Sequence, residues 1–164
     1  VGVFQVRIAQ HQHPGLVEIQ PDLARHAAEN ARSKELKVER AVPEGARVLA
    51  DREMLGVVLR NLLQNAIKFT PRGGRIRIVA TASEARWRIG VEDSGVGMAE
   101  AELKKLFRLD GRMRGIGTEG ERGTGFGLMI SKEFAEKMGG TLEARSELGK
   151  GSTFTLELAR AAAD

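Results

Sequence analysis

Residues 61–70 read Asn61-Leu-Leu-Gln-Asn65-Ala-Ile-Lys68-Phe69-Thr70, inside a longer run of helical periodicity. Asn61 and Asn65 are four residues apart, so a helix brings their side chains onto one face, and Lys68 and Phe69 extend that face by a turn. Two amides are unfavourable in a helix rich in leucine and valine, and they are costly to bury without partners. They therefore cap neighbouring backbone groups, face water, or present oxygens to a ligand.

A second segment follows an alternating stretch that predicts a strand, and it reads Asp93-Ser-Gly95-Val-Gly97-Met98. A carboxylate at the end of a strand can accept a hydrogen bond from an exocyclic amine, and glycines let the backbone approach a flat ring closely. An Asx-turn that ends the strand explains the same residues without a ligand. Met98 suits either the core or a ligand contact, because its side chain is flexible.

The third segment lies directly before a predicted helix and reads Gly123-Thr124-Gly125-Phe-Gly127-Leu128. Free N–H groups and the helix dipole at such a start favour phosphate oxygens. A dinucleotide-binding fold does not explain these glycines, because they follow no strand directly and no parallel strand–helix–strand unit surrounds them. The Walker pattern is absent too, since Gly149-Lys-Gly-Ser152 lies in a predicted hairpin and lacks the glycine that should precede it.

The three segments supply, in chain order, amides that can coordinate a metal, a carboxylate for a base edge, and a flexible backbone for phosphates. We interpret Asn65 as offering its carbonyl oxygen to a Mg²⁺ ion whose other ligands are mostly phosphate oxygens and waters. Lys68 then lies near the phosphates as a point charge. Each segment alone has an ordinary structural explanation, but the combination predicts a nucleotide site.

The composition indicates one globular domain. The 164 residues are 41% hydrophobic and 29% charged and include no cysteine, which excludes a disulfide framework, a thiolate metal site and a cysteine nucleophile. No apolar run approaches the length that spans a bilayer, and the start of the sequence lacks the pattern of an export signal. We expect a cytoplasmic domain that makes no membrane contact itself, even where it belongs to a longer protein with a membrane anchor.

The net charge of +4 does not by itself indicate a nucleic-acid partner. The basic residues are scattered, and no aromatic residues interleave with them as a stacking groove requires. A local excess is more informative, because residues 104–122 carry six basic side chains against three acidic ones. This basic, glycine-rich stretch directly precedes the third segment.

The hydrophobic pattern predicts helices that alternate with antiparallel hairpins. Helices are expected from Pro21, with an apolar stripe of Leu23, Ala27, Ala31 and Leu36, and from the N-cap Asp51 until Pro71 stops the helix. Further helices are expected over about 99–107 and 125–138. Hairpins are expected for the strand pairs 36–42 with 46–50, 75–83 with 85–92, and 141–146 with 152–158. This order indicates an α+β fold with one mixed sheet and helices on one face.

We expect the domain to span residues 21–160. Residues 1–20 are interpreted as a linker or an edge strand, with an alternating stretch from Val3 to Ile8, and residues 161–164 as a frayed tail.

Four segments of the chain resemble the sequence boxes of sensor histidine kinases. The runs that begin at Asn61, Asp93, Leu106 and Gly123 look like the N, first glycine, F and second glycine boxes of that family. The resemblance covers about residues 20–160, with the four boxes in order at suitable spacing. It implies the Bergerat ATP-binding fold shared with gyrase, heat-shock-90 and mismatch-repair ATPases: a two-layer α/β sandwich with a mixed, mostly antiparallel sheet, three main helices on one face, and a glycine-rich ATP lid.

The resemblance also implies roles for the matching residues. Asn65 is the expected Mg²⁺ ligand, Asp93 the expected partner of the adenine amine, and Thr153 matches a position that often touches adenine through water. Asn61, Asn65 and Lys68 are the expected catalytic residues. Asn61, Lys68, Phe69 and Gly97 are expected to line the site, and Gly123, Gly125, Gly127 and Leu128 to contact phosphates or ribose from the lid. Gly95, Met98 and Thr124 are further expected nucleotide contacts.

The basic stretch 108–122 becomes the ATP lid in this interpretation. Arg114 and Arg122 are its expected phosphate-binding cations. One cation about 4 Å from a phosphate oxygen contributes about 4 kcal/mol before desolvation and ordering costs. The F box is incomplete, since Leu109 stands where a second phenylalanine is common.

Asn61 departs from the pattern of hydrolytic relatives, which carry a glutamate there as general base toward water. An amide cannot act as that base, so the site suits transfer of the γ-phosphoryl group to an acceptor, mainly by positioning and charge neutralisation. The acceptor expected from the family is a histidine followed by an acidic residue, and His11, His13 and His26 do not match it.

The missing acceptor implies two partners, a histidine-bearing dimerisation domain and a downstream response regulator. Two alternatives stay open at this point: a regulatory module that only binds nucleotide, and a serine-phosphorylating anti-sigma-type kinase of the same fold.

Overall fold

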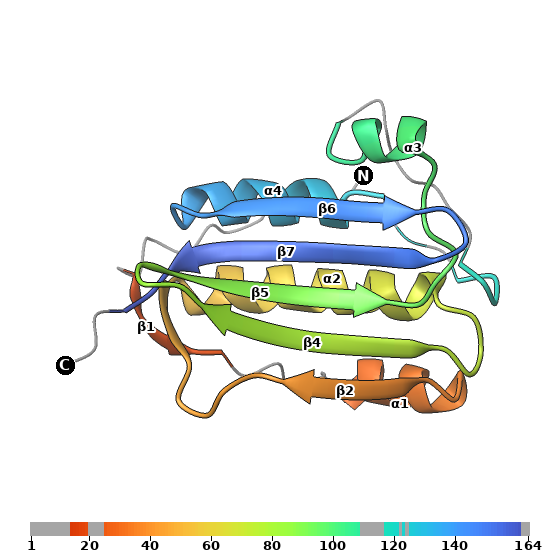
Figure 1. Cartoon of the computed structure of the whole chain (residues 1–164), viewed down its shortest axis with the longest axis horizontal. Coiled ribbons are helices and arrows are strands. Elements are labelled where there is room, and N and C mark those ends of the chain that lie inside the picture. Colours follow the sequence, from red (N-terminus) through yellow and green to blue (C-terminus); the bar gives the residue numbers. More distant parts are fainter. Residues whose placement is uncertain (1–13, 20–24, 109–116, 122, 124, 162–164) are drawn as a thin grey trace, which may run out of the picture.

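The helix that carries Asn61 and Asn65 is the longest in the molecule and lies across one face of a five-stranded sheet (Figure 1). The structure is a computed structural model that describes residues 14–19, 25–108, 117–121, 123 and 125–161. This helix, α2 (Arg52–Phe69), begins as predicted at Asp51, whose carboxylate accepts hydrogen bonds from the backbone N–H groups of Glu53 and Met54, both at 2.9 Å. It ends at Thr70, directly before Pro71.

The large sheet is mixed and mostly antiparallel, as predicted. Its strand order is β2-β4-β5-β7-β6, and only β2 and β4 run parallel. In that order the strands are β2 (Lys37–Ala41), β4 (Arg75–Ala82), β5 (Arg86–Asp93), β7 (Gly151–Ala159) and β6 (Thr141–Glu147). The predicted hairpins β4–β5 and β6–β7 are both present.

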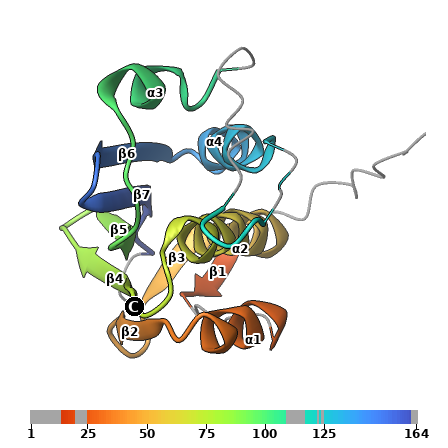
Figure 2. The same ribbon diagram turned by 90° about the vertical axis from the view of Figure 1, so that its right-hand side faces the viewer.

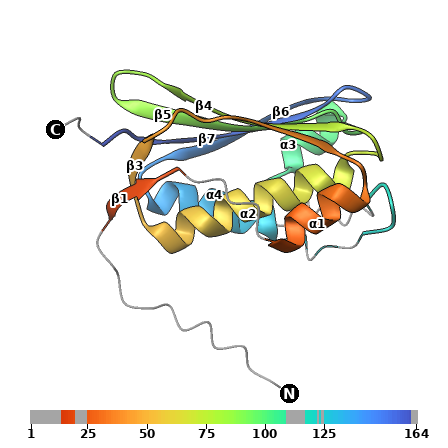
Figure 3. The same ribbon diagram turned by 90° about the horizontal axis from the view of Figure 1, so that it is seen from below.

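Three main helices cover one face of this sheet, which makes the predicted two-layer sandwich (Figure 3). Beside α2 lie α1 (Arg25–Ser33) and α4 (Gly127–Lys137). The short α3 (Glu100–Lys105) follows β5 and lies to one side of the sandwich (Figure 1). The predicted start of α1 at Pro21 lies outside the described residues, and Leu36, expected on its apolar stripe, lies beyond its end.

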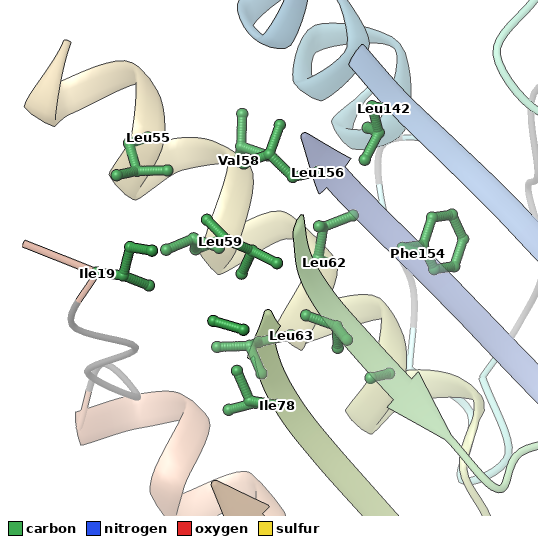
Figure 4. Close-up of a cluster of buried hydrophobic side chains, with 14 of the residues drawn as sticks. Ile19, Leu55, Val58, Leu59, Leu62, Leu63, Ile78, Leu142, Phe154 and Leu156 are labelled. Atoms are coloured by element: carbon green, nitrogen blue, oxygen red, sulfur yellow. The ribbon is translucent and has the colours of Figure 1, made fainter. Parts of the chain in front are cut away.

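The core forms between α2 and the covered face of the sheet, as Figure 4 shows. Alternate residues of the strands, such as Ile78 and Leu156, meet the three- and four-residue stripe of α2, where Leu62 is fully buried. Each such leucine or isoleucine stabilises the fold by about 1.5–3 kcal/mol relative to an exposed position. Further α2 residues in this layer are Leu55, Val58, Leu59, Leu63, Ala66 and Ile67.

The predicted hairpin between 36–42 and 46–50 is wrong. Both strands exist, but β2 pairs in parallel with β4, whereas β3 (Arg47–Ala50) pairs with β1 (Gly15–Glu18) in a separate two-stranded antiparallel sheet. A period of two identifies a strand but not its partner. The buried side chains of Val48 and Ala50 belong to the same core as Val17, so burial draws β3 toward β1.

The strand within residues 1–20 is therefore β1, and the alternating stretch from Val3 to Ile8 lies outside the described residues. Val17 and Ile19 are buried in the core, and the backbone N–H of Ile19 donates to the carbonyl of Ala46 at 2.8 Å. At the other end of the chain, residues 162–164 lie outside the described part.

Candidate nucleotide-binding site

A hollow of about 450 Å³ lies where α2 meets α1, the start of α4 and the lid residues Glu119, Glu121, Gly123 and Gly125. It brings together the first and third sequence segments, which are about sixty residues apart. From the first segment it is lined by Asn61, Asn65, Lys68 and Phe69, and from the third by Gly123, Gly125, Gly127 and Leu128.

Asn61 joins α2 to the start of α4. Its side-chain N–H group donates to the carbonyl of Gly127 and to the hydroxyl of Ser131, both at 3.1 Å. Ser131 is fully buried and donates its own hydroxyl to the Gly127 carbonyl at 2.7 Å. Asn61 thus bonds a neighbouring backbone group, as the structural explanation of the amides requires, and its carbonyl oxygen accepts no hydrogen bond from the residues that the structure describes.

Asn65 lies one turn further along the same face of α2 and is half-buried. Its side chain borders the hollow and makes no hydrogen bond to any described residue. Mg²⁺ binds oxygen ligands and accepts an amide carbonyl among them. The side-chain oxygen of Asn65 therefore fits such an ion.

Lys68 carries a positive charge on the rim of the same hollow. Its ammonium nitrogen lies 4.9 Å from the centroid of the Phe69 ring, within the range of a cation–π interaction. Burial lowers the pKa of Lys68, and the nearby carboxylate of Glu121 partly opposes that shift. A side chain placed on Gly123 would come within 3.1 Å of the Lys68 ammonium nitrogen, so a lid glycine lies against this lysine.

Asp93 lies at the end of β5, and only its Oδ1 atom has hydrogen-bond partners among the described residues. Oδ1 accepts the backbone N–H of Gly95 at 2.8 Å and that of Ser152 at 3.3 Å. The Asx-turn is thus present, while Oδ2 accepts no hydrogen bond from the described residues. Burial raises the pKa of Asp93, and the two backbone hydrogen bonds oppose the rise.

Gly95 and Gly97 allow close backbone approach in the loop after β5. A side chain at Gly95 would lie 2.4 Å from the carbonyl oxygen of Phe69, which accepts the N–H of Val96 at 3.1 Å. Gly97 has a φ of +65°, and a side chain there would lie 2.0 Å from the carbonyl oxygen of Glu147. These contacts dock the loop onto the end of α2 and the β6–β7 hairpin. Met98 is buried in the core.

Asp93 and Thr153 border a second hollow, of about 440 Å³, rather than the first. Thr153 lies opposite Glu92 in the β5–β7 register, and Ser152 lies opposite Asp93. Because side chains alternate along a strand, Thr153 faces away from the core that holds Phe154, whereas Ser152 shares the face of Asp93. Sequence reasoning missed Ser152, although its spacing of two from Phe154 indicates that face.

The lid is only partly described. Arg114, Arg122 and Thr124 lie outside the described residues. Residues 117–121 dock beside the end of α2, where the backbone N–H of Thr118 donates to the carbonyl of Lys68 at 3.0 Å (Figure 2). The same segment contacts Lys34, a buried residue that sequence reasoning did not single out.

Comparison with known proteins identifies the family. Residues 50–162 match the family described as histidine kinase-, DNA gyrase B- and HSP90-like ATPases. The chain belongs to this family. Members share the predicted α/β sandwich, so the resemblance stated from the four sequence boxes is confirmed.

Similar sequences come from sensor kinases. The chain is 34% identical over 158 residues to histidine protein kinase DivJ of Caulobacter vibrioides, covering 96% of this chain and 25% of DivJ. It is 36% identical over 108 residues to sensor protein SrrB of Staphylococcus aureus, covering 66% of this chain and 18% of SrrB. The chain therefore spans about a quarter or less of these relatives.

Similar folds occur in solved histidine kinases. The catalytic domain of histidine kinase ThkA matches with a TM-score of 0.75 and 27% identity, over 91% of this chain and 97% of that domain. Full-length ShkA, solved in complex with AMPPNP, matches with a TM-score of 0.74 and 31% identity, over 94% of this chain and 33% of ShkA. The chain is a catalytic ATPase domain of the sensor histidine kinase type. Among the described residues, no helix is long and apolar enough to cross a membrane.

Proposed function

We propose that this domain binds ATP with Mg²⁺ and transfers the γ-phosphoryl group to a histidine on a separate dimerisation domain. The observation that carries the proposal is the first hollow, where the amide of Asn65, the charge of Lys68 and three lid glycines come together. The Asn65 amide has no hydrogen-bond partner among the described residues. The similar sequence of DivJ and the similar structure of ThkA both belong to histidine kinases, which supports the same reaction.

The residues of the first hollow bind and orient phosphates in this proposal. Asn65 holds the metal through its side-chain oxygen, and Lys68 attracts the phosphates as a point charge. Gly123, Gly125 and Gly127 present backbone N–H groups to phosphate or ribose, and Leu128 lines the same hollow. Thr124 is proposed as a further nucleotide contact of the lid. When bound, Mg²⁺ neutralises phosphate charge during transfer. Arg114 and Arg122 are proposed as further cations of the lid.

The end of β5 binds the base in this proposal. Oδ2 of Asp93, which has no partner among the described residues, accepts a hydrogen bond from the exocyclic amine of adenine. Oδ1 keeps its hydrogen bond from Gly95 in the loop that also contains Gly97. The hydrogen bond from Val96 to Phe69 joins this loop to the end of α2, which supports one continuous site. Ser152, on the same sheet face as Asp93, is a better candidate for a base contact than Thr153.

In this proposal Asn61 holds the start of α4 against α2 and does not activate a water molecule. Its N–H group bonds Gly127 and Ser131, and an amide has no basic oxygen to take a proton. The site therefore favours transfer to an acceptor, which supports a histidine-bearing dimerisation domain as the first partner and a response regulator as the second. We also propose that the ATP-binding domain comprises residues 21–160 together with β1, which precedes that range, because Val17 of β1 lies in the core.

Transfer of radiolabelled γ-phosphate tests the proposal. The chain is mixed with Mg²⁺, labelled ATP and a separately purified helical dimerisation domain that carries the acceptor histidine. We expect acid-labile label on the acceptor domain, no label when its histidine is replaced by alanine, and no label on the chain incubated alone. Nucleotide binding without any transfer would contradict the kinase reaction and leave a regulatory module, and faster labelling of a serine would indicate an anti-sigma-type kinase.

A further inference from the structure

Lys34 is a buried lysine with a complete set of hydrogen-bond partners. It follows α1 and is 3% exposed. Its ammonium donates to the carbonyl of Ile67, the hydroxyl of Thr118 and the Oε1 of Glu121, each at 2.7 Å, with the carbonyl of Lys68 at 3.3 Å. Three short bonds use all three N–H groups of an ammonium. Lys34 thereby connects the last turn of α2 to the base of the lid.

The base of the lid, residues 117–121, is a compact turn around these contacts. The N–H of Gly117 donates to the carbonyl of Glu121 at 2.8 Å, and the N–H of Glu119 donates to Oε2 of Glu121 at 2.9 Å. A side chain at Gly117 would lie within 2.7 Å of both Glu121 and Lys68, so the turn packs directly on α2. The position of this turn therefore depends on the hydrogen bonds and the ion pair of the Glu121 side chain.

Both carboxylate oxygens of Glu121 have partners other than Lys68. Oε1 pairs with Lys34 and Oε2 accepts the Glu119 N–H. The Lys68 ammonium has no carboxylate within 4.0 Å among the described residues, although Glu121 is near enough to influence its charge. Among the described residues, Glu121 and Lys68 both lie against the same position at Gly117, so without Lys34 the Glu121 carboxylate would have the Lys68 side chain beside it.

An ordinary helix cap does not account for this arrangement. Capping the last carbonyls of α2 needs only the bond to Ile67, and surface lysines make such contacts without being buried. Here the burial of Lys34 costs desolvation that its partners must offset, and two of those partners belong to the lid.

We propose that Lys34 is a positioning residue of the nucleotide site: by holding Glu121 and Thr118, it keeps the base of the lid on α2 and keeps the Glu121 carboxylate from pairing with Lys68. The inference rests on the proposed function, because Lys68 is taken to attract nucleotide phosphates. Without Lys34, the Glu121 carboxylate would compete with nucleotide phosphate for Lys68. The ion pair between Glu121 and Lys34 prevents that competition.

Calorimetric titration of the chain with ATP and Mg²⁺ tests this inference. We expect Lys34→Met to weaken ATP affinity about tenfold, the change that follows if the binding-ready arrangement is populated about one tenth of the time. Lys34→Met/Glu121→Gln should bind ATP more tightly than Lys34→Met, since the competing charge is gone. Lys37→Met is the matched control, because Lys37 is exposed and its one ion pair with a described residue is with Glu39 on β2.

Circular dichroism checks that each variant folds. If Lys34→Met does not fold, Lys34→Gln takes its place in both the single and the double variant. Unchanged affinity of the Lys34 variant, an equal loss in Lys37→Met, or a double variant no tighter than the single one would each overturn the inference. An unmodified chain that binds no ATP would overturn the proposed function first, and the inference with it.

Discussion

The side-chain amide of Asn61 donates a hydrogen bond to the hydroxyl of Ser131 across 3.1 Å, and this bond joins the middle of α2 to the first turns of α4. Both groups also bond the carbonyl of Gly127, the first residue of α4. The three residues form a closed polar cluster against the core. Because Gly127 is also the last lid glycine, the cluster fixes where the lid joins α4.

Removing either side chain of this cluster should destabilise the fold. We expect Asn61→Ala and Ser131→Ala each to lower the free energy of unfolding by about 1–2 kcal/mol, the usual cost of leaving a buried partner without its hydrogen bond. The double variant should lose less than the sum, since the two share one bond. Urea denaturation measures all three, with the exposed Arg60→Ala on α2 as control. Strict additivity would show that the two side chains are independent.

Asp93→Asn should weaken adenine-nucleotide affinity. Asparagine can keep the Oδ1 bonds to Gly95 and Ser152, but it replaces the free Oδ2 acceptor with an N–H₂ donor. Loss of one charged acceptor costs about 1.5–3 kcal/mol, or about tenfold to a hundredfold in affinity. Glu92→Gln is the control, because Glu92 is the adjacent residue on the opposite face of β5. Calorimetry that gives equal affinities for Asp93→Asn and the unmodified chain would contradict the adenine contact.

Asn65→Ala should weaken ATP binding mainly when Mg²⁺ is present. The side chain has no hydrogen-bond partner among the described residues, so its removal leaves no protein group unpaired and should change stability little. We expect a clear loss of affinity in Mg²⁺ and a small one in chelator, measured by the same titration. Equal losses in the two conditions would argue for a direct nucleotide contact in place of metal ligation.

The fold was predictable from the sequence where a local pattern decides it. The stripe of α2 and the alternation of β4, β5 and β7 each follow from a period of 3.6 or 2, and the short loops between antiparallel strands specify their pairing. The partner of β3 was not predictable in this way. It pairs with β1, about thirty residues earlier in the chain, because Val17 and Val48 share a core that a local pattern does not reveal.

The candidate site was predictable to the extent that its segments carry unusual residues. Asn65 and Lys68 line the first hollow together with the lid glycines, as a combined reading of the segments expects. Ser131 and Lys34 were not predicted, because a serine inside a helix and a lysine after one are usually solvated. Their importance arises from contacts to residues 70 or more positions away, such as Asn61 to Ser131 and Lys34 to Glu121.

Gly97→Ala should be severely destabilising. Its φ of +65° disfavours any side chain, and the added Cβ would meet the carbonyl oxygen of Glu147 at 2.0 Å. Gly149 provides a matched control in the neighbouring hairpin, since it has a φ of +80° but open space around its Cβ position. Gly149→Ala should therefore cost only about 1–2 kcal/mol for the backbone conformation, and Gly97→Ala clearly more. Similar unfolding midpoints in urea would show that the loop moves aside for a methyl group.

The ion pair between Glu121 and Lys34 should make the free energy of unfolding depend on pH in the acid range. Partial burial acts to raise the pKa of Glu121, but hydrogen bonds from Lys34 and from backbone N–H groups outweigh it, so the pKa lies below the ordinary value of 4.5. A carboxyl whose pKa is lowered by folding contributes stability above its unfolded pKa, and that contribution is lost as pH falls through the folded pKa.

The unfolding free energy of the unmodified chain should therefore fall more steeply below pH 4.5 than that of Glu121→Gln, which has no carboxyl to protonate. Urea denaturation at a series of pH values measures both slopes. Glu84→Gln serves as control, because Glu84 is exposed and has no ion pair among the described residues. The control should keep the slope of the unmodified chain. If Glu121→Gln kept that slope as well, the carboxylate of Glu121 would not be held by Lys34 in solution, and the base of the lid would need another anchor.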